Sequence, residues 1–127
     1  LTLKLKKERK NNMWLHVALN PTAVKCDPEY PIPYVDGEPS DNYFFDEKVA
    51  QALEKDGFLS EMWHKFDATF DWGDYDYFDY KKCITFRQWL IERLKSPTNT
   101  IVKPVYDTML DYANKAIKYH TGIGFDF

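Results

Sequence analysis

The sequence predicts a mostly α fold: a single compact helical domain of about four helices, a small β element near the N-terminus and a long Pro-rich loop. Three observations carry this expectation. The 127 residues suit one domain with its own core. Apolar residues recur at helical spacing through most of the chain after residue 46. Five of the seven prolines fall between residues 21 and 42.

The chain divides into a basic N-terminal arm, residues 1–12, and one globular domain, residues 13–127. The arm contains five basic residues against the single acid Glu8. It is either a flexible native extension or an artificial one. No internal repeat or low-complexity segment suggests a further domain.

The first part of the domain favours extended structure. Residues 13–19 are short, apolar and modestly alternating, which predicts a strand. The prolines of residues 21–42 exclude a regular helix there, so this segment is expected to be a long extended connection.

Two helices are expected between residues 46 and 70. Asp46 suits the N-cap of the first helix, and Gly57 follows its end in a position that favours glycine. In the second helix an apolar residue recurs at every fourth position: Phe58, Met62, Phe66 and Phe70.

Two more helices are expected in the C-terminal part. A capping-box pattern, Thr85 to Gln88, starts one helix, which ends near Ser96. The last begins near Pro104 and ends at Gly122 and Gly124, leaving Phe125 and Phe127 as an aromatic tail.

Charge is strongly segregated along the chain. Residues 27–79 carry fifteen acidic residues against three basic ones, a sum of −12, whereas residues 80–127 carry eight basic residues against four acidic ones. The acidic part ends in the stretch FDWGDYDYFDY, residues 70–80, with four aspartates and six aromatic rings. This layout concerns partners and association rates more than fold.

The sequence contains no catalytic signature, so we expect the chain not to be an enzyme and to need no cofactor or metal. No serine has a nucleophile-elbow context, and the five glycines form no phosphate loop. The acidic stretch matches a calcium loop poorly. An alternative is a metal-binding enzyme or sensor using Glu61, His64 and nearby aspartates, although a di-iron bundle would need a second Glu-x-x-His pair.

Acidic side chains interleaved with flat rings resemble a nucleic acid, which also presents negative charges and flat aromatic surfaces to a basic protein. Direct nucleic-acid binding is disfavoured because phosphates need Lys or Arg, whereas a basic partner would be steered to this face. The predicted partner-binding residues are Glu61, Asp67, Asp71, Trp72, Asp74, Tyr75, Asp76, Tyr77 and Asp79. The other interpretation, a bent loop closing over the core with a solvated acidic side, stays open.

Two segments resemble the immunity proteins of bacterial contact-dependent growth inhibition (CDI) systems. They are LSEMWHKFDATFDWGDYDYFDYKKCITFRQWLIERL (59–94) and MLDYANKAIKYHTGIGFDF (109–127), together a little over half of the chain. The resemblance implies a small cytoplasmic protein that binds and blocks the C-terminal toxin domain of a cognate effector. Those toxins are often nucleases, so the acidic stretch would cover a basic active site.

The sequence therefore predicts an immunity protein that neutralises a cognate toxin domain, with an acidic adaptor for another basic protein as the remaining alternative. A cytoplasmic location is expected, because no apolar run is long enough for a membrane span and no signal peptide is visible. Cys26 and Cys83 follow no metal or disulfide pattern and are expected to be reduced packing thiols.

Overall fold

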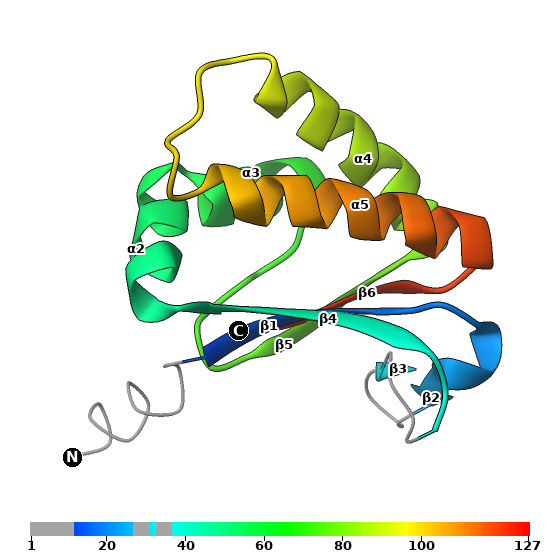
Figure 1. The fold of residues 1–127 in the computed structure, drawn as a ribbon. Coiled ribbons are helices and arrows are strands. Elements are labelled where there is room, and N and C mark those ends of the chain that lie inside the picture. The colour runs from blue at the N-terminus through cyan, green and yellow to red at the C-terminus, as the bar shows by residue number, and fades with distance from the viewer. Residues whose placement is uncertain (1–11, 27–30, 33–36) are drawn as a thin grey trace.

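The fold is a two-layer α/β arrangement. The computed structural model describes residues 12–26, 31–32 and 37–127. A four-stranded antiparallel sheet forms one layer, and the helices cover one of its faces (Figure 1). The prediction of a mostly α domain is therefore wrong, because strands supply a whole layer of the core.

The sheet has the strand order β4-β1-β6-β5, so β4 and β5 are its edges. The strands are β1 (Asn12–Ala18), β4 (Ser40–Asp46), β5 (Tyr75–Asp79) and β6 (Gly122–Asp126). The predicted N-terminal strand is confirmed as β1 within one residue at each end. It pairs with both β4 and β6, which makes it a central strand.

The C-terminal segment is also a central strand, and the prediction of an aromatic tail is wrong. Ile123 and Phe125 are fully buried between β1 and β5. Glycines weaken a strand signal in the sequence, but Gly122 is required here by close packing. A Cβ at this position would lie 2.4 Å from both Phe78 O and the Tyr77 ring.

The four predicted helices exist. They are α2 (Glu47–Lys55), α3 (Phe58–Phe66), α4 (Tyr80–Leu94) and α5 (Lys103–Tyr119). Asp46 caps α2 as predicted, accepting a hydrogen bond from Val49 N at 3.1 Å. Gly57 has a φ of +91°, the left-handed conformation expected just after a helix end.

Two helix boundaries differ from the prediction. The second helix ends at Phe66 because Asp67 adopts a left-handed conformation with a φ of +54°, so Phe70 reaches the core from a loop instead. The third helix begins five residues before Thr85, because Asp79 accepts the capping hydrogen bond from Lys82 N at 2.8 Å.

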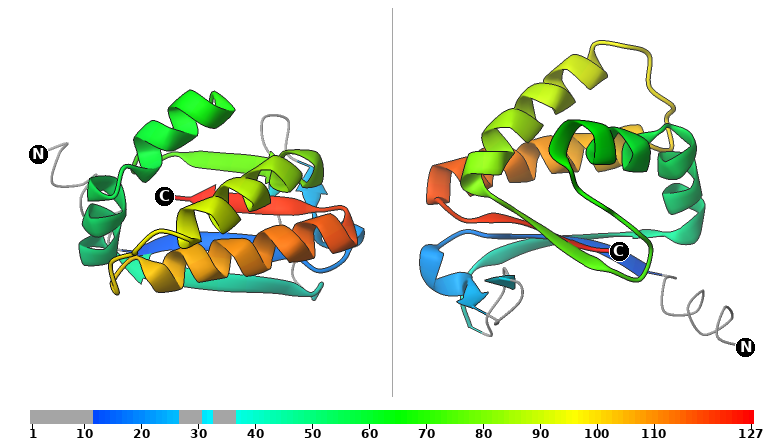
Figure 2. Two further views of the ribbon diagram at one scale, coloured as in Figure 1. Left: turned by 90° about the horizontal axis from the view of Figure 1, so that it is seen from above. Right: turned by 180° about the vertical axis from the view of Figure 1, so that it is seen from behind.

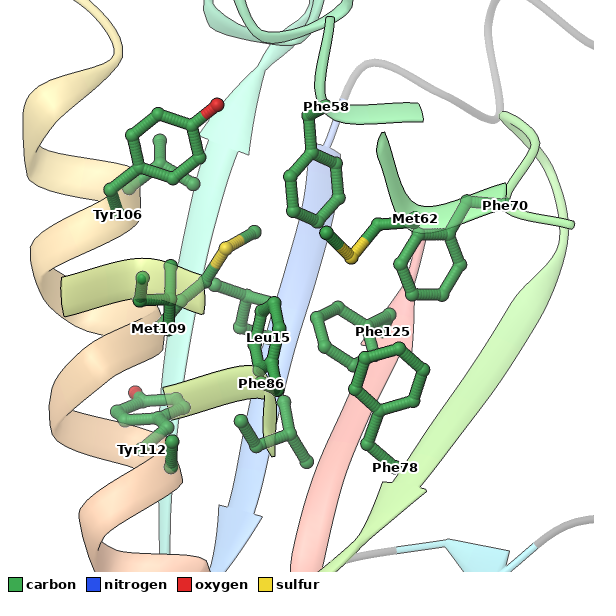
Figure 3. Close-up of a cluster of buried hydrophobic side chains, with 14 of the residues drawn as sticks. Leu15, Phe58, Met62, Phe70, Phe78, Phe86, Tyr106, Met109, Tyr112 and Phe125 are labelled. Carbon is green, nitrogen blue, oxygen red and sulfur yellow. The ribbon is translucent and has the colours of Figure 1, made fainter. Parts of the chain in front are cut away.

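The core lies between the sheet and the helices (Figure 3). The sheet contributes alternate residues, among them Leu15, Phe78 and Phe125, and the helices contribute rings and thioethers such as those of Phe86 and Met109. Cys83 is a free thiol in this core, and burial raises its pKa to about 12. The predicted reduced packing role is confirmed for this cysteine.

A partly buried polar network ties three helices together. Asp56, at the end of α2, accepts hydrogen bonds from Arg93 Nη2 at 2.7 Å, Arg93 Nε at 3.2 Å and the Tyr106 hydroxyl at 2.5 Å. Burial, reinforced by Asp56, raises the pKa of Tyr106. This network fixes α2 against α4 and α5 on the side of the molecule away from the sheet.

The predicted Pro-rich connection is wrong at its end, where Ser40 to Asn42 belong to strand β4, and before that it contains only short elements in its described parts. These are a 3₁₀ turn (η1, Pro21–Ala23) and two strands of two residues each, β2 (Lys25–Cys26) and β3 (Pro31–Ile32). The β2–β3 pair lies on the sheet face opposite the helices (Figure 1). The predicted basic arm, except for Asn12, lies outside the described residues, as do residues 27–30 and 33–36.

Candidate protein-binding surface

The segment from Asp67 to Asp74, here called the acidic loop, connects α3 to β5. Its first residues alternate in burial: Ala68 and Phe70 are buried, whereas Asp67, Thr69 and Asp71 are exposed. This alternation explains the composition of the sequence here. Small and aromatic residues attach the loop to the core, and the acids between them face solvent.

The start of the acidic loop is held by backbone hydrogen bonds and ring packing. Asp67 N donates to Trp63 O and Ala68 N donates to Met62 O, both at 3.1 Å. The Phe70 ring then packs on Phe125 with ring centroids 4.8 Å apart. Figure 3 shows Phe70 beside Phe125 and Phe78.

The far end of the loop is held by Trp72. Its ring packs on that of Phe127 with centroids 5.2 Å apart, and its Nε1 donates to Glu54 Oε1 at 3.2 Å. Asp74 N donates to Asp71 O at 3.2 Å, closing a turn in which Gly73 has a φ of +99°. Trp72 thus fastens the loop to α2 and to the C-terminus, a role the sequence did not reveal.

Negative charge is crowded where the loop enters β5. Asp74 is exposed, and Asp76 is half-buried two residues later. Burial, and next the negative charge of Asp74, raise the pKa of Asp76 to about 6, while Lys82 opposes this. A cation bound here would reduce the repulsion between the carboxylates of Asp74 and Asp76.

The two predicted tyrosines pack on the molecule itself. By strand alternation they lie on the sheet face opposite the helices, whereas Asp76 lies on the helix side with the buried Phe78. The Tyr75 hydroxyl donates to Pro31 O at 2.6 Å, and the Tyr77 ring covers Gly122. Both rings are half-buried.

The remaining predicted residues lie away from the loop. Asp79 is exposed but caps α4, and it stands at the far end of β5, about 17 Å from Asp74 at the usual rise of a strand. Glu61 lies in the first turn of α3, whereas the loop follows the last turn. The structure therefore brings together Asp67, Asp71, Trp72, Asp74 and Asp76 on one continuous segment.

Glu61 and His64 share α3, but the imidazole is engaged locally. His64 Nδ1 donates to Ser60 O at 2.7 Å. Within the described ranges, no three His, Cys, Asp or Glu side chains are grouped so that they could hold a metal ion.

Sequence reasoning missed the partners that position the loop. Glu54 is 18 residues before Trp72, and Phe127 is the last residue. No local pattern joins them to Trp72, since the contacts depend on β6 lying inside the sheet.

Comparisons with family models, with curated proteins and with solved structures gave no significant match. In the described part of the chain, every helix is too short or too polar to cross a bilayer.

Proposed function

We propose that this chain is a cytoplasmic immunity protein that binds a basic toxin domain and blocks it by covering its active site with the acidic loop. The main support for the proposal is the alternation of exposed and buried side chains along that loop. Its exposed carboxylates belong to Asp67, Asp71 and Asp74, and between them Ala68 and Phe70 are buried in the core.

A fixed loop suits tight binding because little conformational entropy remains to be lost. Backbone hydrogen bonds hold one end, and Trp72 packed on Phe127 holds the other. Preorganisation of this kind improves affinity mainly by reducing the ordering cost of association. The carboxylates are therefore presented to a partner in one arrangement.

The charge of the loop suits a basic partner. A basic toxin cleft attracts carboxylates over long range and accelerates encounter. The half-buried Asp76, whose pKa is raised to about 6 by burial and by Asp74, adds a local gain, since lysine or arginine from a partner would favour its ionised form.

The proposed interface assigns fewer direct contacts than the one the sequence predicts, because two of the predicted residues pack on the chain itself. Tyr75 and Tyr77 pack on Pro31 and Gly122 and contribute to the shape of the surface. Direct contacts are assigned to the carboxylates of the acidic loop, with the partly exposed face of Trp72 between them. The chain acts by occlusion and performs no reaction.

The proposal predicts a toxin encoded next to the gene for this chain, and the test uses the C-terminal domain of that toxin. The test variant is Asp67→Asn/Asp71→Asn/Asp74→Asn. Asparagine tolerates the left-handed backbone of position 67, and at position 71 its side-chain oxygen can still accept the hydrogen bond from Trp72 N. The control variant, Glu92→Gln/Asp107→Asn/Asp111→Asn, changes net charge equally at exposed sites on α4 and α5.

Wild-type chain is expected to inhibit the toxin's nuclease activity at a one-to-one ratio. The acidic-loop variant should bind about 10- to 100-fold more weakly, because each lost charge contact contributes about 0.5 to 1 kcal/mol. The control should change affinity less than about threefold. If both variants bind equally weakly, the acidic loop is not part of the interface. Binding without inhibition would favour the adaptor alternative.

A further inference from the structure

A groove lies between α2 and the connection from α4 to α5, residues 95–102. Figure 1 and both views of Figure 2 show this connection passing beside α2. The groove has a volume of about 650 Å³, which is within the usual range for sites that hold small molecules. The side chains that matter for binding are Lys48, Gln51, Ala52 and Lys55 on α2 and Asn99 and Ile101 on the connection.

One face of α2 forms the first wall of the groove. Lys48, Gln51, Ala52 and Lys55 follow one another at the spacing of three or four residues that places side chains on one face of a helix. Both lysines are exposed, and neither has a hydrogen bond or an ion pair within the described residues. At the rise of a helix their Cα atoms are about 10 Å apart, so their long side chains can reach one group bound between them.

The second wall is held in place by hydrogen bonds around Asn99. Its Oδ1 accepts a hydrogen bond from Ile101 N at 2.7 Å, and its backbone O accepts one from Lys103 N at 2.9 Å. In the described part of the chain, the Nδ2 group of Asn99 has no partner. Ile101 is 38% exposed beside it. This wall therefore offers one polar donor and one apolar surface.

The two acids at the groove, Asp56 and Glu54, already have partners. Asp56 is paired with Arg93 at 2.7 Å, and Glu54 Oε1 accepts a hydrogen bond from Trp72 Nε1 at 3.2 Å. Two lysines and Arg93 oppose these two acids, so the groove has a net charge of +1. The surrounding segment, residues 27–79, sums to −12 and contains three basic residues, of which two line this groove.

We propose that this groove binds a small organic anion, with its oxyanion group between Lys48 and Lys55 and its apolar part against Ala52 and Ile101. The ammonium groups can donate charge-assisted hydrogen bonds to a carboxylate or to a phosphate monoester. The Asn99 amide can donate to the same group from the opposite wall. The apolar part gains by leaving water, and the net charge of +1 favours one oxyanion group per ligand.

The first experiment titrates isotope-labelled chain with phenyl phosphate or benzoate and follows the backbone amide signals by NMR. Ligands of this size should bind with a Kd of about 1 to 10 mM, with the largest shifts in residues 48–56 and 99–101. The tighter of the two anions identifies the oxyanion. Inorganic phosphate lacks the apolar part and benzamide lacks the charge, so each should bind at least about threefold more weakly. Equal binding of either overturns the proposal, as does the absence of shifts in these residues.

The second experiment repeats the titration with Lys48→Gln/Lys55→Gln and with the control Lys65→Gln/Lys81→Gln. The control removes the same charge at two exposed lysines on α3 and α4. The groove variant should bind about tenfold or more weakly, whereas the control should change the Kd less than about twofold. Equal weakening in both variants would show attraction to the overall charge of the chain and overturns the proposal.

Asn99→Asp tests the second wall without removing its turn. The aspartate oxygen can still accept the hydrogen bond from Ile101 N, while the new negative charge repels an oxyanion. The melting temperature should be nearly unchanged and the Kd should rise about tenfold. Unchanged binding would overturn the placement of the ligand between the two walls. None of these measurements uses a toxin, so their outcome is independent of the proposed function.

Discussion

At the scale of single residues, Asp76 links the edge of the sheet to the charge of the acidic loop. Its side chain points to the helix side of β5, where burial and Asp74 raise its pKa to about 6. The folded chain therefore binds a proton at Asp76 more tightly than the unfolded chain, whose carboxyl pKa is near 3.8. The stability contributed by the protonated form is complete below about pH 3.8 and is lost as pH rises toward 6.

Replacing Asp76 with asparagine should consequently increase the free energy of unfolding at pH 7 and leave it nearly unchanged at pH 3.5. We expect a gain of about 1 kcal/mol, after a large reduction for the solvent exposure of this half-buried group. Urea unfolding at the two pH values measures the difference. Asp74→Asn should give a smaller gain with the same pH dependence. An equal gain at both pH values would contradict the assigned cause.

At the scale of elements, the sequence predicts the helices well but not where each of them begins and ends. Helical periodicity located α2, α3, α4 and α5, because amphipathic stripes and caps are local properties. The beginning of α4 was missed because two capping patterns compete. Asp79 is itself the last paired residue of β5, and no local rule shows that this cap prevails over Thr85.

The cap at Asp79 has a consequence for stability that is separate from partner binding. Asp79→Ala should lower the free energy of unfolding by about 1 kcal/mol, because Lys82 N loses its acceptor at the start of α4. Asp79→Asn should retain most of the stability, since asparagine is an equally good cap. Thermal or urea unfolding of the two variants measures this. A similar loss in both would show that charge, not capping, is the important property.

The strand β4 was missed because the prolines before it predicted a loop that continued through residue 42. The strands β5 and β6 were missed for a different reason. Each has only five residues, β5 alternates aspartate with rings, and β6 contains two glycines. Such segments carry weak strand signals on their own. They become strands because the Tyr77 ring fits over Gly122 and because Phe78, Ile123 and Phe125 complete the core. The acidic and aromatic character of the site could be predicted from the sequence, but its division into packed rings and exposed acids could not.

At the scale of the whole molecule, the two edges of the sheet have different surroundings. The acidic loop leads into β5, and the open strand β4 lies at the opposite edge.

Electrostatic capture by the acidic loop predicts that the rate of association with a basic partner depends strongly on salt. In stopped-flow measurements with the toxin domain, the association rate constant of the wild-type chain should fall about tenfold or more from about 0.02 to 0.5 M salt. The slope should be clearly flatter for Asp67→Asn/Asp71→Asn/Asp74→Asn and nearly unchanged for Glu92→Gln/Asp107→Asn/Asp111→Asn. A wild-type rate that does not depend on salt, or equal slopes for the two triple variants, would contradict the account.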